Sequence, residues 1–151
     1  MFKKIFRPGC RLFAIGSILM LLTAAAHTAG QFAPAPNDAA LNSVLSAMQG
    51  YKLDMGMGMK PSIEEVYYSL AFTMSILLLF LGVQNLVSIY LAGDSAKLMR
   101  SLTAINLLCV VAQVILNWHY RIPPPLISFV LISLVFILSL ALPGNREARN
   151  S

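Results

Sequence analysis

Charged residues are scarce in this chain and are absent from four long stretches. Only 11% of its 151 residues are Asp, Glu, Lys or Arg, whereas soluble domains carry about 25%. The uncharged stretches cover residues 12–29, 66–92, 101–118 and 122–143. A transmembrane helix needs about 20 mostly apolar residues to cross a ~30 Å hydrocarbon core. The scarcity of charge therefore excludes most classes of soluble enzyme and predicts an integral membrane protein.

Groups that usually carry chemistry are also scarce. The four stretches contain no carboxylate and a single histidine, His27, which disfavours proton transport because membrane proton relays use Asp, Glu or His. The two cysteines, Cys10 and Cys109, form no CxxC pair and lie at different depths, so we expect no disulfide between them. Without a nucleophile–base pair or clustered carboxylates, the sequence predicts no catalytic residue and no cofactor, and it favours a non-enzymatic role.

Apolar residues dominate what is present, at 58% of the chain. Spans at about 12–30, 66–92, 99–118 and 122–142 leave no room for a separate soluble domain. Short links join the second span to the third and the third to the fourth, which places those helices antiparallel and adjacent. The predicted fold is all-α: one integral membrane domain over residues 1–151, built as a transmembrane four-helix bundle.

The basic residues change sides with each predicted crossing. Eight lie before the first span, between the second and third, or after the fourth, and three lie in the other two connections. The eight are Lys3, Lys4, Arg7, Arg11, Lys97, Arg100, Arg146 and Arg149, and the three are Lys52, Lys60 and Arg121. This positive-inside pattern places both termini in the cytoplasm. It also assigns the net charge of +5 to topology and not to nucleic-acid binding.

The first span has an alternative interpretation as a secretory signal. A basic start, an apolar run and the small residues Ala24, Ala25 and Ala26 resemble a signal peptide with its cleavage site. The apolar run continues to Gly30, however, and small and polar residues align on one helical face, which suits a retained span that packs against partners. We favour the retained span; a mature chain starting near His27 would contradict it.

The only long connection, residues 31–62, is predicted to lie on the side of the membrane opposite the cytoplasm. Within it, Leu41, Val44, Leu45 and Met48 follow the spacing of an amphipathic helix, which Asn37 or Asp38 can cap. Such a helix would lie across the mouth of the bundle or along the headgroups. The connection ends on the capping-box pattern of Ser62 and Glu65, which predicts the start of the second span helix.

Polar side chains recur within the spans at helical spacing. The aligned sets are Thr73, Gln84 and Ser88 in the second span and Asn106, Gln113 and Asn117 in the third. Unpaired polar groups are costly in lipid, so we expect both stripes to face the interior. They serve either as interhelical hydrogen-bond partners or as the lining of a cavity for a small lipid-like or quinone-like ligand. The ligand-binding candidates are His27, Gln84, Asn106, Gln113 and Asn117, and His27 with His119 would form a pH-sensitive or metal-binding pair.

Three methionines interleaved with glycine form a separate candidate site. Met55, Met57 and Met59 lie in the long connection, and thioethers select soft ions such as Cu(I). The alternative is a flexible apolar loop pressed onto the membrane.

The segment 26–30 (AHTAG) closes the first span, and the segment 57–62 (MGMKPS) leads into a second span that bears tyrosines. With these motifs the chain resembles a family of small four-span bacterial membrane proteins, and its layout is similar to that of DoxX-like four-helix proteins. The resemblance implies a four-helix bundle in the bacterial inner membrane and supplies no catalytic residue. Its expected partners are the lipid bilayer and either other membrane proteins or a small hydrophobic ligand. The functions in view are an accessory protein, a ligand-binding protein and a soft-metal protein.

Overall fold

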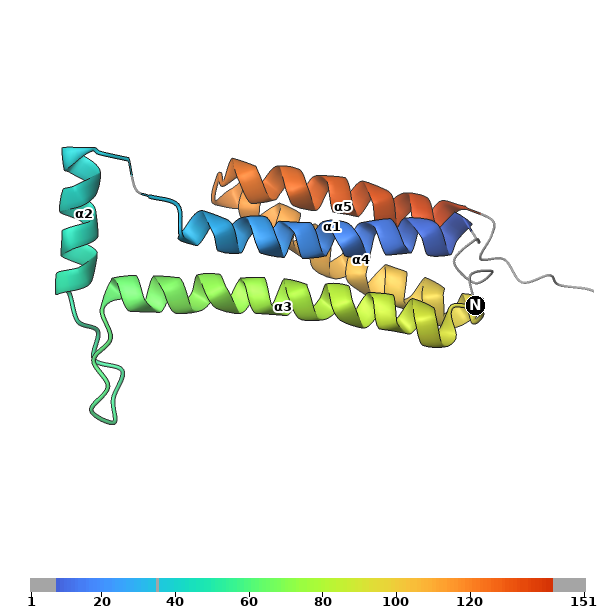
Figure 1. The fold of residues 1–151 in the computed structure, drawn as a ribbon, viewed down its shortest axis with the longest axis horizontal. Helices are drawn as coiled ribbons and strands as arrows, with labels where there is room; N and C mark the ends of the chain where they lie inside the picture. The colour runs from blue at the N-terminus through green and yellow to red at the C-terminus, as the bar shows by residue number, and fades with distance from the viewer. Residues whose placement is uncertain (1–7, 35, 143–151) are drawn as a thin grey trace, which may run out of the picture. The chain divides into compact units, whose positions relative to one another are not determined.

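The chain folds into helices joined by short connections. The computed structural model describes residues 8–34 and 36–142, which contain five helices. The helices are α1 (Pro8–Gln31), α2 (Ala39–Gly50), α3 (Ile63–Ala92), α4 (Ala96–His119) and α5 (Pro123–Ala141) (Figure 1). All except α2 are long and apolar enough to cross a membrane. The predicted all-α fold, with four spans and a short helix in the long connection, is confirmed.

The fold divides into two compact units. The bundle unit comprises residues up to Thr23 and from Leu78 onward, and so holds most of α1, the second half of α3, and α4 and α5. The loop unit comprises Ala24–Leu77, and so holds the end of α1, all of α2 and the first half of α3. A single membrane domain over residues 1–151 stays a prediction.

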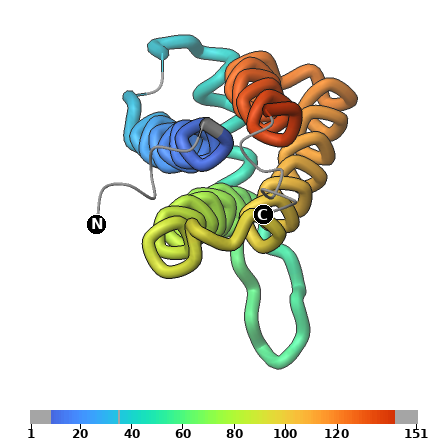
Figure 2. Tube along the Cα trace, turned by 90° about the vertical axis from the view of Figure 1, so that its right-hand side faces the viewer, coloured from blue at the N-terminus to red at the C-terminus, as the bar shows by residue number. Residues whose placement is uncertain are grey.

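Helices α4 and α5 lie side by side in the bundle unit (Figure 2). Pro123, Pro124 and Pro125 occupy the first turn of α5, where the missing N–H groups would have no helical partner in any case. The turn before them closes through hydrogen bonds from the backbone N–H groups of Tyr120 and Ile122 to carbonyls in the last turns of α4. A tight turn of this kind holds the two helices antiparallel, as the short link predicts.

The core of the bundle unit is made of large side chains from several helices. Phe13 of α1 and Phe136 of α5 are buried, with ring centroids 5.7 Å apart. The Ser139 hydroxyl of α5 donates to the Gly9 carbonyl of α1 at 2.8 Å. Other side chains that are almost completely buried are Met20, Met99, Val110, Phe129 and Ile132. The start of α1 is therefore an integral part of the bundle unit.

In the loop unit, side-chain caps define where two helices begin. The Asp38 carboxylate accepts hydrogen bonds from the backbone N–H groups of Ala40 and Leu41 at 2.8 and 3.2 Å, so it is the N-cap of α2. At the start of α3, the Glu65 N–H donates to the Ser62 hydroxyl at 3.1 Å, and the Ser62 N–H donates to the Glu65 carboxylate at 2.6 Å. The predicted capping box is thus confirmed, and α2 runs across the direction of the first turns of α3 (Figure 1).

Candidate functional site

The most polar point inside the bundle unit is a pair of asparagines from α3 and α4. The Asn85 amide donates to the Asn106 side-chain oxygen at 2.9 Å, and the Asn106 amide donates back at 3.1 Å. Asn85 is only 2% exposed and Asn106 only 5%. The Asn106 amide also donates to the Leu102 carbonyl at 2.8 Å, and the Asn85 amide lies 3.9 Å from the Met20 sulfur. This network joins α1, α3 and α4 at one place.

The predicted polar stripe of α4 is placed on the inner side of that helix. Asn106 and Asn117 are buried and Gln113 is half-buried. The Asn117 amide donates to the Gln113 carbonyl at 2.8 Å, within the same helix. The structure brings Asn106 to another helix, whereas the hydrogen bond of Asn117 stays within α4.

The orientation predicted for the stripe of α3 is wrong. Gln84 is exposed, and the adjacent Asn85, which the stripe omits, is buried. The alignment depends on Thr73 and Ser88, but their hydroxyls donate to the carbonyls of Ser69 and Gln84 at 2.7 and 2.8 Å. A hydroxyl that bonds to its own helix four residues back needs no interior partner, so it does not mark the buried face.

The buried face of α3 follows a different signal. Leu78, Gly82, Asn85 and Ile89 are all buried, at intervals of three and four residues. Small residues on the contact face let membrane helices approach closely. In the sequence, the small residue Gly82 indicates the buried face that includes Asn85, whereas Thr73 and Ser88 do not.

The other hydroxyls of the bundle interior are mostly satisfied within the protein. Ser17 and Thr103 each donate to the carbonyl four residues earlier in their own helix, at 2.7 Å. Ser139 donates across to α1, as described above. In the described part of the bundle unit, the Ser133 hydroxyl is the buried side-chain polar atom without a hydrogen-bond partner. Most of the buried polar groups in the bundle unit therefore have hydrogen-bond partners within the protein.

The helices of the bundle unit pack closely at two glycines, Gly16 and Gly82. A Cβ atom placed on Gly16 would lie 2.3 Å from the Phe136 ring. A Cβ atom placed on Gly82 would lie 2.5 Å from Leu21 and 3.1 Å from the Ser17 carbonyl oxygen. Interior atoms therefore occupy the space beside both glycines.

His27 lies elsewhere, in the loop unit, near the end of α1. It is half-buried, and its Nε2 atom has no hydrogen-bond partner among the described residues. Aromatic rings gather in the same unit, with Phe32 and Phe72 centroids 5.8 Å apart and Tyr68 and Phe72 centroids 6.4 Å apart. His119 and the polar stripe of α4 belong to the bundle unit, so a pair of His27 with His119 stays a prediction.

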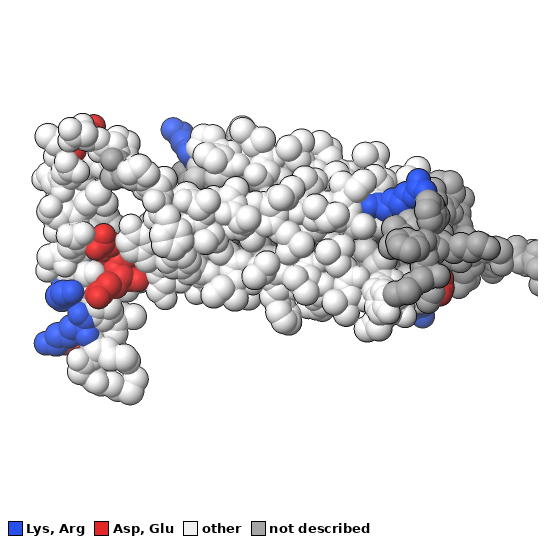
Figure 3. All heavy atoms as spheres, viewed as in Figure 1, with Lys and Arg blue, Asp and Glu red and all other residues white. Residues whose placement is uncertain are grey.

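Charged side chains lie near the ends of the long helices. Glu64 and Glu65 are in the first turn of α3, Lys97 and Arg100 are in the first turns of α4, and α5 carries none. Along the length of the helices the visible surface in Figure 3 is uncharged. Five of the basic residues that set the predicted topology lie outside the described residues: Lys3, Lys4, Arg7, Arg146 and Arg149.

These groups have limited chemical capacity. Paired amides donate and accept hydrogen bonds but transfer no proton at neutral pH. Within residues 8–34 and 36–142, no three His, Cys, Asp or Glu side chains cluster in a way that could hold a metal ion. The soft-metal site predicted at Met55, Met57 and Met59 would use thioether donors instead, and it stays a prediction.

No protein-family model, curated protein or solved structure matches this chain.

Proposed function

We propose that this integral membrane protein is a non-enzymatic accessory protein of the bacterial inner membrane, and that it acts by contacts with other membrane proteins. Its four apolar spans make it a multi-pass membrane protein. The observation that supports the accessory role is the Asn85–Asn106 pair, in which two buried amides satisfy each other. A binding cavity would instead leave such groups available to a ligand. The polar interior is thus better explained as helix-to-helix attachment.

The orientation that goes with this proposal has both termini in the cytoplasm. It is supported by the eight basic residues on one side against three on the other, because lysine and arginine are enriched in cytoplasmic loops. Among the described residues each side of the membrane holds three basic residues, so the excess of basic charge on the cytoplasmic side depends on the terminal segments. Membership in the family of small four-span bacterial proteins, DoxX-like in layout, is part of the same proposal.

A retained first span is also proposed. Cleavage near His27 would remove Phe13, Ser17 and Met20, each at most 1% exposed in the bundle unit. Deleting large buried side chains costs about 2–5 kcal/mol each. A chain cut there would lose a large share of the interior that α3 and α5 pack against.

Cysteine labelling tests this orientation. In a C10A/C109A background, we expect Met57→Cys to react with a membrane-impermeant maleimide in intact cells whose outer membrane has been made permeable. Asp94→Cys, in the connection between α3 and α4, should react only after the inner membrane is opened. Equal labelling of both positions in intact cells, or a purified chain whose N-terminal sequence starts near His27, would contradict the proposed topology.

A second candidate function, binding of a small lipid-like or quinone-like molecule, is favoured by one observation. The Nε2 atom of His27 is buried and unpaired, and an unsatisfied buried polar atom costs about 1–3 kcal/mol. A ligand carbonyl or hydroxyl would remove that cost, and the aromatic rings of Phe32, Tyr68 and Phe72 offer an apolar surface within the same unit.

Native mass spectrometry of the detergent-extracted protein separates the two functions. The accessory role predicts the bare chain, alone or with a protein partner, and no small molecule at a fixed ratio. Ligand binding predicts an added mass that is lost in His27→Phe and kept in Gln84→Leu, a matched change at an exposed polar position. An added mass that follows this pattern would replace the first proposal with the second.

A further inference from the structure

The connection from α2 to α3 is a small antiparallel hairpin. Lys52 and Ser62 form a bridge, and the Leu53 N–H donates to the Pro61 carbonyl at 2.8 Å. Closer to the tip, the Met55 N–H donates to the Met59 carbonyl at 3.1 Å. These contacts define a single register. The two residues of each facing pair are equally far in sequence from Met57, which lies at the tip.

The register divides the hairpin into two chemically different faces, because successive side chains of an extended segment point to opposite sides. One face holds the apolar residues Tyr51, Leu53, Met55, Met59, Pro61 and Ile63. The other holds Lys52, Asp54, Lys60 and Ser62. Met55 and Met59 are therefore directly opposite each other on the apolar face, where cross-strand Cβ atoms are about 4.5–5.5 Å apart.

The tip of the hairpin holds this arrangement in place. Gly56, Met57 and Gly58 all have positive φ angles, of 79°, 49° and 79°, and glycine adopts such angles without steric cost. The Gly56 N–H donates to the Asp54 carboxylate at 3.0 Å. On the polar face, Asp54 and Lys60 pair across the hairpin at 3.9 Å. The two arms are thus joined at the tip and across the charged face.

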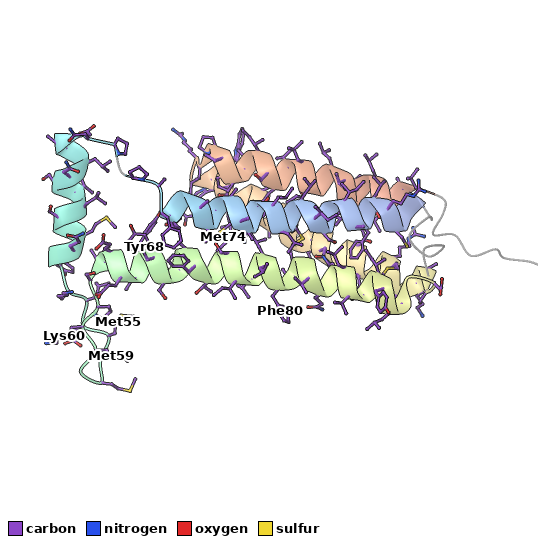
Figure 4. All side chains as sticks on the ribbon, in the orientation of Figure 1. Met55, Met59, Lys60, Tyr68, Met74 and Phe80 are labelled. Atoms are coloured by element: carbon purple, nitrogen blue, oxygen red, sulfur yellow. The ribbon has the colours of Figure 1, made fainter. Side chains whose placement is uncertain are left out.

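We propose that Met55 and Met59 bind one soft monovalent ion, Cu(I) or Ag(I), between their sulfur atoms. Both side chains are accessible, at 59% and 54% exposure, and both lie on the hairpin that projects beside the first turn of α3 (Figure 4). Three rotatable bonds let each thioether turn toward a shared ion. Thioethers prefer Cu(I) and bind hard ions poorly, so this pair selects against Mg²⁺ and Ca²⁺.

Met57 has a different place in the hairpin. It lies at the apex, is 92% exposed and has no residue opposite it in the register. We therefore assign the site to Met55 and Met59 and not to all three methionines of the motif. This makes Met57 a matched control, because replacing it removes the same thioether from the same loop.

The test is a titration of the full-length protein with Ag(I), using [methyl-¹³C]methionine and the C10A/C109A background so that thiols do not compete. The methyl signals of Met55 and Met59 should shift together and saturate at one Ag(I) per chain. M55L and M59L should each weaken Ag(I) binding by about tenfold or more. Loss of a residue that only supports a metal ligand already lowers metal affinity by about 10–100-fold, and these variants remove a ligand itself. M57L should leave the affinity unchanged.

Leucine keeps the volume of methionine at these exposed positions, and the signals of the buried Met20 and Met99 report whether each variant is folded. Absence of saturable shifts in the folded wild type would overturn the proposal. So would an M57L variant as weak as M55L, because the register would then not define the site. Shifts of the same signals on transfer to lipid vesicles but not with Ag(I) would assign the apolar face to lipid contact and also overturn it.

Discussion

Replacing Asn85 by leucine is expected to lower the free energy of unfolding by about 2 kcal/mol. The change leaves the buried Asn106 side chain without its amide partner, and an unsatisfied buried polar group costs about 1–3 kcal/mol. Hydrogen bonds between membrane helices are themselves worth only about 0.6–2 kcal/mol. Most of the loss in free energy of unfolding therefore comes from leaving the buried Asn106 amide without a partner. Reversible unfolding in mixed micelles, followed by circular dichroism, measures the effect.

The double variant N85L/N106L identifies the source of that loss. The double variant leaves no buried amide without a partner. Its loss in free energy of unfolding should therefore be smaller than the sum of the losses in N85L and N106L, by about 1 kcal/mol or more. Gln84→Leu is the matched control, since Gln84 is the exposed neighbour of Asn85 on the same helix, and it should change stability by less than about 0.5 kcal/mol. Additive single effects would show that the two amides do not act as a pair.

Adding one methyl group at Gly16 or Gly82 is expected to destabilise the bundle unit by about 1–3 kcal/mol each, the usual cost of overpacking an interior. The new Cβ at Gly16 would lie 2.3 Å from the Phe136 ring, which is fully buried and has little room to move. At Gly82 it would meet Leu21 and the Ser17 backbone. The same unfolding measurement applies to Gly16→Ala and Gly82→Ala.

Gly30 provides the control within α1. Nothing lies within 4 Å of a Cβ placed there, so Gly30→Ala should be neutral or stabilise by up to about 1 kcal/mol, the difference in helix propensity. A Gly16→Ala variant as stable as Gly30→Ala would mean that α1 and α5 do not pack closely at Phe136.

The parts of the fold that sequence predicts well depend on neighbours along the chain. The spans follow from the lack of charge over long segments, and the starts of α2 and α3 follow from the caps at Asp38 and Ser62. The caps join residues two or three positions apart, and the composition of a span depends on no contact between distant residues. Helices α1, α3 and α4 extend beyond their uncharged stretches, whereas α5 lies within its own.

The candidate site was only partly predictable. The predicted interior position of Asn106 agrees with its burial, but the interior stripe predicted for α3 includes the exposed Gln84 and omits Asn85, the residue that pairs with Asn106. Adjacent residues on a helix point about 100° apart, so a small error in the helix rotation exchanges an interior residue for an exposed one. Hydroxyl residues misled the alignment because they satisfy their hydrogen bonds within their own helix.

The sequence by itself determined the number of spans, the helix caps and the asymmetry of basic charge. These follow from transfer free energies and hydrogen bonds that act locally, residue by residue. Only the tertiary structure decided that Asn85 meets Asn106, that Phe136 closes over Gly16, and that Met55 faces Met59. Such pairings depend on helix rotation and hairpin register, which are set by close contacts between residues distant in the chain or across a turn.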